Sequence, residues 1–222
     1  MKREAKDAKR FTKNEMRILI TAGGTREYID PVRFISNASS GKMGYELARA
    51  ALKAGHKVTL ITAPTAQKPP NTAEVIGVET AAQMFEAVKK YFARCDCLIM
   101  AAAVADYTPV RSAKTKLKKT DQNLTIKLKP TPDILKWAGK HKKKNQIVVG
   151  FALEDKAIRA RAEKKLKEKN LDMIVANTPA AIGAAESVVH FKHRGGSWIE
   201  LHRATKNVIA QRVIREVEKL TD

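Results

Sequence analysis

The residues with the clearest chemical potential lie in one loop, 21–44, which reads TAGGTREYIDPVRFISNASSGKMG. The loop follows an apolar run, precedes a helix-like segment, and holds two glycine clusters, one at Gly23-Gly24 and one at Gly41 and Gly44. Such a loop leaves backbone N–H groups free at the start of a helix, where the helix dipole also favours an anion. The loop therefore predicts a phosphate-binding site.

Two familiar phosphate motifs do not fit this loop. A dinucleotide-binding GxGxxG has its glycines directly after the first strand, and an acidic residue closes the second strand. Here the second glycine cluster comes many residues later, and the second strand ends in Thr62-Ala63-Pro64-Thr65, which contains no acid. A P-loop also fails, because GKT or GKS does not occur at the required spacing. An NAD(P)-dependent oxidoreductase is thus disfavoured and is kept as an alternative.

A second group of polar and small residues, AAAVADY at 101–107, follows a near-continuous apolar run. In a doubly wound sheet, residues just beyond the carboxyl ends of the strands face the ligand crevice. Asp106 at that place could accept hydrogen bonds from a sugar or a base, or it could cap a turn. The KLKK run at 116–119 follows, and taken alone such a run indicates solvated surface.

Alternating apolar runs and helical periodicities predict the elements that position these groups. Strands are expected at 17–21, 58–62, 74–78, 97–102, 147–153 and 173–176, an exposed strand or flap at 124–128, and helices at 42–54, 80–92, 131–140 and 156–169. A hairpin over 187–192 and 198–202 and a last helix capped by Thr205 complete the chain. This order predicts an α/β fold with a doubly wound, mostly parallel, Rossmann-like sheet. We expect a basic arm over 1–16 and a single domain over 17–222.

The net charge of +20, from 43 Lys and Arg against 23 Asp and Glu, admits three interpretations. They are nucleic-acid binding, an anionic small substrate, and a lysine-rich solvated surface. The basic residues concentrate in 111–144 and 156–169, which favours a local anion site. A nucleic-acid-binding module stays an alternative, although no aromatic run is interleaved with the basic ones.

Other features exclude some classes of protein. No segment approaches the roughly 20 apolar residues of a membrane span, and the first residues are too charged for a secretory signal. We therefore expect a cytoplasmic protein with no membrane partner. Cys95 and Cys97 would point to one face if they share a strand, and without neighbouring Cys or His they predict ordinary core residues rather than a metal site.

Taken together, these segments resemble phosphopantothenoylcysteine synthetase (phosphopantothenate–cysteine ligase), which in many bacteria and archaea is the C-terminal half of a bifunctional coenzyme A biosynthesis protein. The resemblance rests on the loop 21–44, AAAVADY, KLKK, PDIL at 132–135, GFALE at 150–154 and KNLDMIVAN at 169–177. It implies a ligase in which the carboxylate of 4′-phosphopantothenate attacks the α-phosphate of CTP. Pyrophosphate leaves, L-cysteine attacks the acyl-cytidylate, and CMP is released.

The resemblance also implies roles for individual residues. Asn37 would contact the acyl group, and Lys116 would reach the acyl-phosphate from a mobile flap. Ser39, Gly41 and Gly44, with Gly24, would cradle phosphate. The nucleotide would be held by Ala102, Ala103, Asp106, Pro132, Asp133, Ile134, Leu135, Phe151, Lys165 and Lys169, with Asn177 as a further candidate.

The same resemblance sets expectations about cofactors and partners. CTP and Mg²⁺ are expected, with ATP as the alternative nucleotide, and the metal ligands are unknown. A homodimer is expected, with 124–128 as a pairing region. FMN is not expected in this chain, because the flavin-dependent phosphopantothenoylcysteine decarboxylase half would lie before Arg17 or in a partner. The sequence leaves open whether the synthetase stands alone or is an excised domain.

Overall fold

The protein is described here by a computed structural model, which covers residues 15–181 and 183–221. An eight-stranded sheet lies at its centre, in the order β12-β11-β10-β9-β6-β1-β4-β5. The parallel strands are β1 (Arg17–Ala22), β4 (Lys57–Thr62), β5 (Glu74–Gly77), β6 (Cys97–Met100), β9 (Ile147–Leu153) and β10 (Met173–Asn177). The antiparallel hairpin of β11 (Glu186–His193) and β12 (Trp198–Thr205) extends one edge. The predicted α/β fold is confirmed, whereas the predicted arm lies almost wholly outside the described residues.

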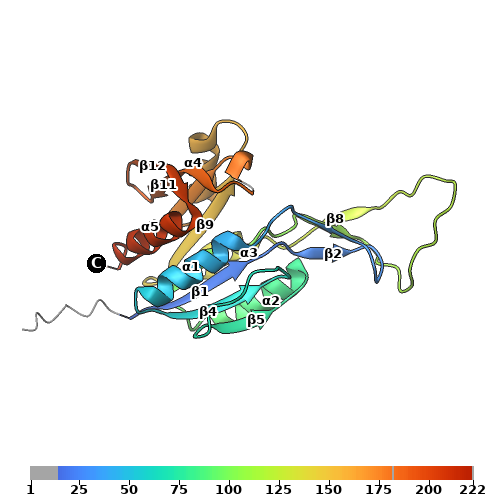
Figure 1. The fold of residues 1–222 in the computed structure, drawn as a ribbon, viewed down its shortest axis with the longest axis horizontal. Coiled ribbons are helices and arrows are strands. Elements are labelled where there is room, and N and C mark those ends of the chain that lie inside the picture. Colours follow the sequence, from blue (N-terminus) through green and yellow to red (C-terminus); the bar gives the residue numbers. More distant parts are fainter. Residues whose placement is uncertain (1–14, 182, 222) are drawn as a thin grey trace, which may run out of the picture.

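Helices cover both faces of this sheet, as a doubly wound fold requires (Figure 1). Helices α1 (Lys42–Lys53) and α5 (Lys206–Glu218) pack on one face, where Leu47 and Val213 belong to the same buried cluster. Helices α2 (Ala81–Phe92), α3 (Ile134–His141) and α4 (Ile158–Glu168) pack on the other, around Met84 and Leu166. A short 3₁₀ turn, η1 (Pro179–Ala181), follows β10. Within 15–181 and 183–221 no helix is both long and apolar enough to cross a bilayer.

Side-chain caps determine where three helices begin. Thr80 forms a capping box with Gln83, and Thr205 accepts a hydrogen bond from the backbone N–H of Val208, so both predicted caps are confirmed. Asp133 caps α3 by accepting from the backbone N–H of Lys136 at 2.9 Å. The helix predicted over 131–140 therefore starts later, at Ile134, and Pro132 lies directly before the cap.

Two short hairpins and a long loop project from one end of the sheet (Figure 1). The first hairpin joins β2 (Arg26–Tyr28) to β3 (Phe34–Ser36), and the second joins β7 (Tyr107–Pro109) to β8 (Leu128–Pro130). Residues 110–127 between β7 and β8 form the loop, which we call the flap. Of the exposed strand or flap predicted at 124–128, residues 124–127 belong to the flap and Leu128 begins β8.

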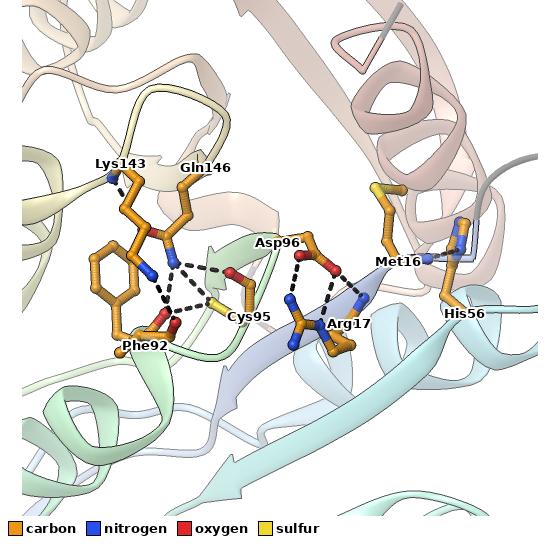
Figure 2. Close-up of polar contacts among 9 residues, drawn as sticks. Met16, Arg17, His56, Phe92, Cys95, Asp96, Lys143 and Gln146 are labelled. Carbon is orange, nitrogen blue, oxygen red and sulfur yellow. Dashed lines mark hydrogen bonds and ion pairs between the residues drawn. The ribbon is translucent and has the colours of Figure 1, made fainter.

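Side-chain hydrogen bonds close the opposite, amino-terminal edge of the sheet (Figure 2). Arg17, which begins β1, binds Asp96 through Nε at 3.1 Å and Nη2 at 2.7 Å. Gln146, just before β9, donates through Nε2 to the carbonyls of Phe92 and Cys95. Cys95 lies before β6 rather than in it, so it packs in a different core cluster from Cys97. The two cysteines therefore do not share a strand, so the condition for a common face is not met, and both are buried as the prediction of core residues requires.

Candidate active site

The carboxyl ends of β1 and β6 meet at the point where the strand order reverses, which is where doubly wound sheets bind ligands. Gly24 and Ala103 form a parallel bridge there. The N–H of Ala103 donates to the carbonyl of Gly23 at 2.8 Å, and the hydroxyl of Thr25 accepts from the N–H of Ala105 at 2.9 Å. The two loops that the sequence selected thus form one hydrogen-bonded unit.

The glycines of the 21–44 loop do not all serve the same purpose. Gly41 adopts a left-handed φ of 71° at the N-cap of α1 and has no side chain that could cap the helix. The N–H of Lys42 donates to the hydroxyl of Ser40 at 3.5 Å, and the next N–H groups of the first turn are available to an anion. The hydroxyl of Ser39 accepts from the N–H of Gly41 at 3.3 Å. Gly44 is buried instead, and an added Cβ would lie 2.5 Å from the Cβ of Ala22. Gly44 thus allows α1 to pack against β1 and does not face outward with Ser39.

Asn37 is exposed and spans the two loops through its side-chain amide. Its Nδ2 donates to the carbonyls of Ala103 at 3.3 Å and Val104 at 3.1 Å. Among the described residues no hydrogen bond reaches Oδ1, so this oxygen is available as an acceptor. In this conformation the NH₂ group of Asn37 is bonded to the 101–106 loop, so Oδ1 is the side-chain atom that remains available to a substrate.

A cavity of about 370 Å³ opens beside Asp106, at the carboxyl ends of β6 and β9. It gathers most of the residues that were expected to hold a nucleotide, although they come from four separate segments. The predicted residues that line it are Ala102, Asp106, Pro132, Asp133, Ile134, Leu135, Phe151, Lys165 and Lys169. Ala103 lies at the bridge with Gly24 rather than in the wall.

Two lysines supply the positive charge of this cavity. Lys165 donates through Nζ to the carbonyl of Phe151 at 2.9 Å, and Lys169 forms an ion pair with Asp133 at 2.8 Å. Burial, with the nearby charge of Lys169, lowers the pKa of Lys165. Burial alone would raise the pKa of Asp133, but the hydrogen bonds from Lys169 and Lys136 lower it overall. The lining of the cavity thus holds two lysines together with two carboxylates, those of Asp106 and Asp133.

Some predicted residues lie outside this cavity. Lys116 is exposed on the flap and is not among the residues that line the cavity. Asn177 ends β10, where its carbonyl accepts from the N–H of Glu154 at 3.0 Å. Asn37 and Ser39 stand at the neighbouring helix N-terminus rather than in the cavity wall. The structure thus brings together in one cavity most of the residues expected to hold a nucleotide, and Lys116 is not one of its lining residues.

Sequence reasoning missed several residues that shape the site. The hydroxyl of Thr131 donates to the carbonyl of Ala105 at 2.6 Å and so fixes the loop beside Asp106. Gly139 lies inside α3, and an added Cβ would come within 1.8 Å of the carbonyl oxygen of Lys169. A glycine within a helical pattern often marks such a close approach, so Gly139 could have been found from the sequence. Thr131 offered no comparable signal.

A larger hollow of about 910 Å³ lies at the carboxyl ends of β4 and β5. Its charged lining residues are Glu79 and Glu86, so its charge is opposite to that expected for a triphosphate site. Within residues 15–181 and 183–221, no group of three or more His, Cys, Asp or Glu side chains is placed to hold a metal ion. The cavity beside Asp106, which has two lysines in its lining, is therefore the better candidate for an anionic ligand.

Comparisons with known proteins show the family to which the chain belongs. The family model for the DNA/pantothenate metabolism flavoprotein C-terminal domain matches residues 13–220. The coenzyme A biosynthesis bifunctional protein CoaBC of Bacillus subtilis is 46% identical over 209 residues, which are 92% of this chain and 51% of that protein. A cysteine/cysteine sulfinic acid decarboxylase from an unknown prokaryotic organism is 44% identical over 92% of this chain and 58% of its own length.

A solved structure extends the comparison to the fold. The crystal structure of the C-terminal domain of a coenzyme A biosynthesis bifunctional protein CoaBC has a TM-score of 0.82 and 40% identity. The match covers 94% of this chain and 97% of that one. The chain spans about half the length of the curated relatives it matches, so the activities in their names belong to longer proteins.

Proposed function

The chain belongs to the family of the DNA/pantothenate metabolism flavoprotein C-terminal domain, and on this premise we propose that it is a phosphopantothenate–cysteine ligase of coenzyme A biosynthesis. It joins 4′-phosphopantothenate to L-cysteine and uses CTP. The motifs that resemble this enzyme coincide with the cavity that contains Lys165 and Lys169 and with the start of α1 at Gly41. The decarboxylase name of one relative is not carried over, because none of the site residues described above suggests that chemistry.

One observation carries this proposal. The side chain of Asn37 is hydrogen-bonded to the same 101–106 loop whose Ala102 and Asp106 line the cavity with the two lysines. The proposed anion site at α1 and the proposed nucleotide pocket are thus both next to the 101–106 loop. A ligase that activates a carboxylate with a nucleotide needs two anionic ligands to meet at one point, and this junction provides it.

The residues divide the two chemical steps between them. In the first step the pantothenate carboxylate forms a bond to the α-phosphorus of CTP while the bond to the pyrophosphate oxygen breaks. Lys165 and Lys169 stabilise charge on the phosphates, and Lys116 reaches the acyl-phosphate when the flap closes. In the second step the cysteine amine attacks the acyl carbon and CMP leaves. Asn37 aligns the acyl group, and its Oδ1 is free to accept from the incoming amine.

Mg²⁺ fits this site as a companion of the triphosphate rather than as a resident metal. Mg²⁺ usually binds through substrate phosphates and one or two carboxylates. Asp133 is committed to Lys169 and to the cap of α3, which leaves Asp106 as the carboxylate of the cavity open to a ligand. The metal would neutralise phosphate charge when CTP is bound.

CTP is favoured over ATP by the PDIL and KLKK motifs and by the lysine pair, which resemble those of the CTP-using branch of the family. We also propose a cytoplasmic homodimer, with a decarboxylase half in a longer chain or a partner. The projecting hairpins and flap expose several large apolar side chains, which a second copy would cover: Val32, Phe34, Tyr107, Val110, Leu124 and Leu128.

The experiment that tests the proposal measures pyrophosphate after mixing the protein with phosphopantothenate, Mg²⁺, L-cysteine and either CTP or ATP. Release with CTP that depends on phosphopantothenate is the expected result. Release with ATP but not with CTP would show that the nucleotide is ATP. No release with either nucleotide would refute the proposed ligase function. Thermal shifts with CTP, NADPH and a DNA oligomer address the alternatives, and stabilisation by the oligomer alone would favour a nucleic-acid-binding module.

A further inference from the structure

The β2–β3 hairpin contains a buried carboxylate to which the proposed mechanism gives no part. Asp30 stands at the hairpin tip and is 1% exposed. Its Oδ1 accepts from the backbone N–H groups of Val32 and Arg33, both at 2.9 Å. Its Oδ2 accepts from Nε of Arg33 at 2.9 Å and from the N–H of Leu117 at 3.1 Å. A buried carboxylate needs several donors to offset its lost hydration, and here one of them comes from the flap.

Arg33 completes the contact from the other side. Its Nη2 binds Oδ2 of Asp30 and also donates to the carbonyl of Leu117 at 2.7 Å. The N–H and the carbonyl of Leu117 are therefore both held by the Asp30–Arg33 pair. The hydrogen bonds from Arg33 keep the pKa of Asp30 well below its usual range, so the pair stays charged at neutral pH.

The hairpin holds the flap at further points, all within its first residues. The N–H of Ala113 donates to the carbonyl of Ile29 at 2.9 Å, and the hydroxyl of Ser112 donates to the carbonyl of Tyr28. Between Leu117 and Lys127, the described flap makes only a local hydrogen bond, within residues 120–122. At the base of the flap, the carbonyl of Lys127 accepts from the N–H of Val110. Lys116 therefore lies at the boundary between a held segment and a free one.

The same hairpin leads directly to Asn37, because β3 ends at Ser36. One short element thus connects the two residues that the ligase would use for catalysis. We propose that Asp30 is a positioning residue for Lys116, acting through Arg33 and the backbone of Leu117, so that the flap base keeps a fixed place relative to Asn37. The role of Lys116 in this statement rests on the proposed ligase function, whereas the attachment of the flap does not.

The first test measures the attachment itself, without substrate. Trypsin should cut the full chain after Lys116 or Lys118 about tenfold faster in Asp30→Asn than in the wild type, because cleavage tracks the population of the open segment. Asparagine is isosteric, but its NH₂ would face the N–H groups of Arg33 and Leu117. Arg33→Gln is a second variant, because Arg33 is partly exposed and its loss should spare folding.

Glu27→Gln is the matched control. Glu27 is a buried carboxylate of the same hairpin, but it accepts from the N–H of Ala81 at 2.8 Å and so holds α2 rather than the flap. It should leave cleavage after Lys116 and Lys118 at the wild-type rate. Equal cleavage in the wild type, Asp30→Asn and Arg33→Gln would overturn the attachment, and so would equal acceleration by Glu27→Gln.

The second test asks whether Asp30 acts through Lys116. Asp30→Asn as a single change should lower the rate of pyrophosphate release. In a Lys116→Gln background it should cause no further loss, because the effects of substitutions at residues that act through one another are not additive. Additive losses would refute the positioning role. A wild-type protein that releases no pyrophosphate would refute the ligase instead, and the protease result would still decide the attachment.

Discussion

The two edges of the central sheet are built for different purposes. At the amino edge, formed by the amino ends of the parallel strands, polar side chains hydrogen-bond to other groups of the protein (Figure 2). Arg17 binds Asp96, and Gln146 donates to the carbonyls of Phe92 and Cys95. At the carboxyl edge, Ser39, Asp106 and Oδ1 of Asn37 face outward, and the start of α1 has no side-chain cap. The amino edge fixes strand positions, whereas the carboxyl edge keeps polar groups available to ligands.

The contrast has an energetic basis. Removing one partner of a buried hydrogen bond leaves the other unsatisfied and costs stability. An exposed polar group makes no such contribution, so it can be selected for ligand contacts alone. Substitutions at the amino edge should therefore change stability without changing kinetics, and substitutions at the carboxyl edge should do the reverse.

The largest effect is expected from Asn37→Asp. The change removes two N–H donors, directs a negative charge at the carbonyls of Ala103 and Val104, and repels an anionic intermediate. We expect turnover to fall by about 100-fold, with only a small fall in melting temperature because both lost hydrogen bonds are exposed to solvent. Asn71→Asp, on an exposed loop, is the matched control. A normal rate of pyrophosphate release would remove Asn37 from the site.

At the amino edge the strongest effect should come from Gln146→Leu. Gln146 is 5% exposed, and leucine would leave the carbonyls of Phe92 and Cys95 without their donor. The free energy of unfolding, measured in urea, should fall by about 2 kcal/mol, with kcat and KM unchanged. Gln211→Leu, on the surface of α5, should change stability by less than about 0.5 kcal/mol. A large change in kcat or KM for Gln146→Leu would contradict the proposal that the amino edge contributes to stability alone.

Lys165→Met should raise the KM for CTP about tenfold, a typical loss for one hydrogen bond to a charged group. Stability should not fall, because burial already disfavours the ammonium form. Since the pKa of Lys165 is lowered, the wild type should lose CTP affinity as pH rises, earlier than an ordinary lysine allows. The variant should lack that alkaline loss. Lys164→Met, on the exposed side of α4, is the control and should keep the wild-type KM and pH profile.

The smallest effect is expected from Asp96→Asn. The hydrogen bond from Arg17 lowers the pKa of Asp96, so its stabilising contribution is present at neutral pH and is lost as pH falls through that lowered pKa. Both side chains are more than a third exposed, so the loss should be well below that of Gln146→Leu. Melting temperature against pH should fall less steeply in acid for the variant. An identical acid limb would show that the pair contributes nothing.

Much of the fold was set by local sequence pattern. The strands and helices that form the core have continuous or periodic apolar residues, and the caps at Thr80 and Thr205 mark helix starts directly. The three-residue strands of the projecting hairpins escaped prediction, because so short a run has no measurable period and gains its pairing from a distant partner.

The sequence by itself also selected most of the candidate site, since the motifs supply Asn37, Asp106 and Lys165 by residue type and order. Only the tertiary structure showed that Gly44 packs against Ala22, that the amide of Asn37 already binds two carbonyls, and that Asp30 holds Leu117. Each of these is a contact between segments that a sequence pattern does not relate. Residue types are fixed locally, whereas distances between loops arise only when the sheet and its two helical layers have packed.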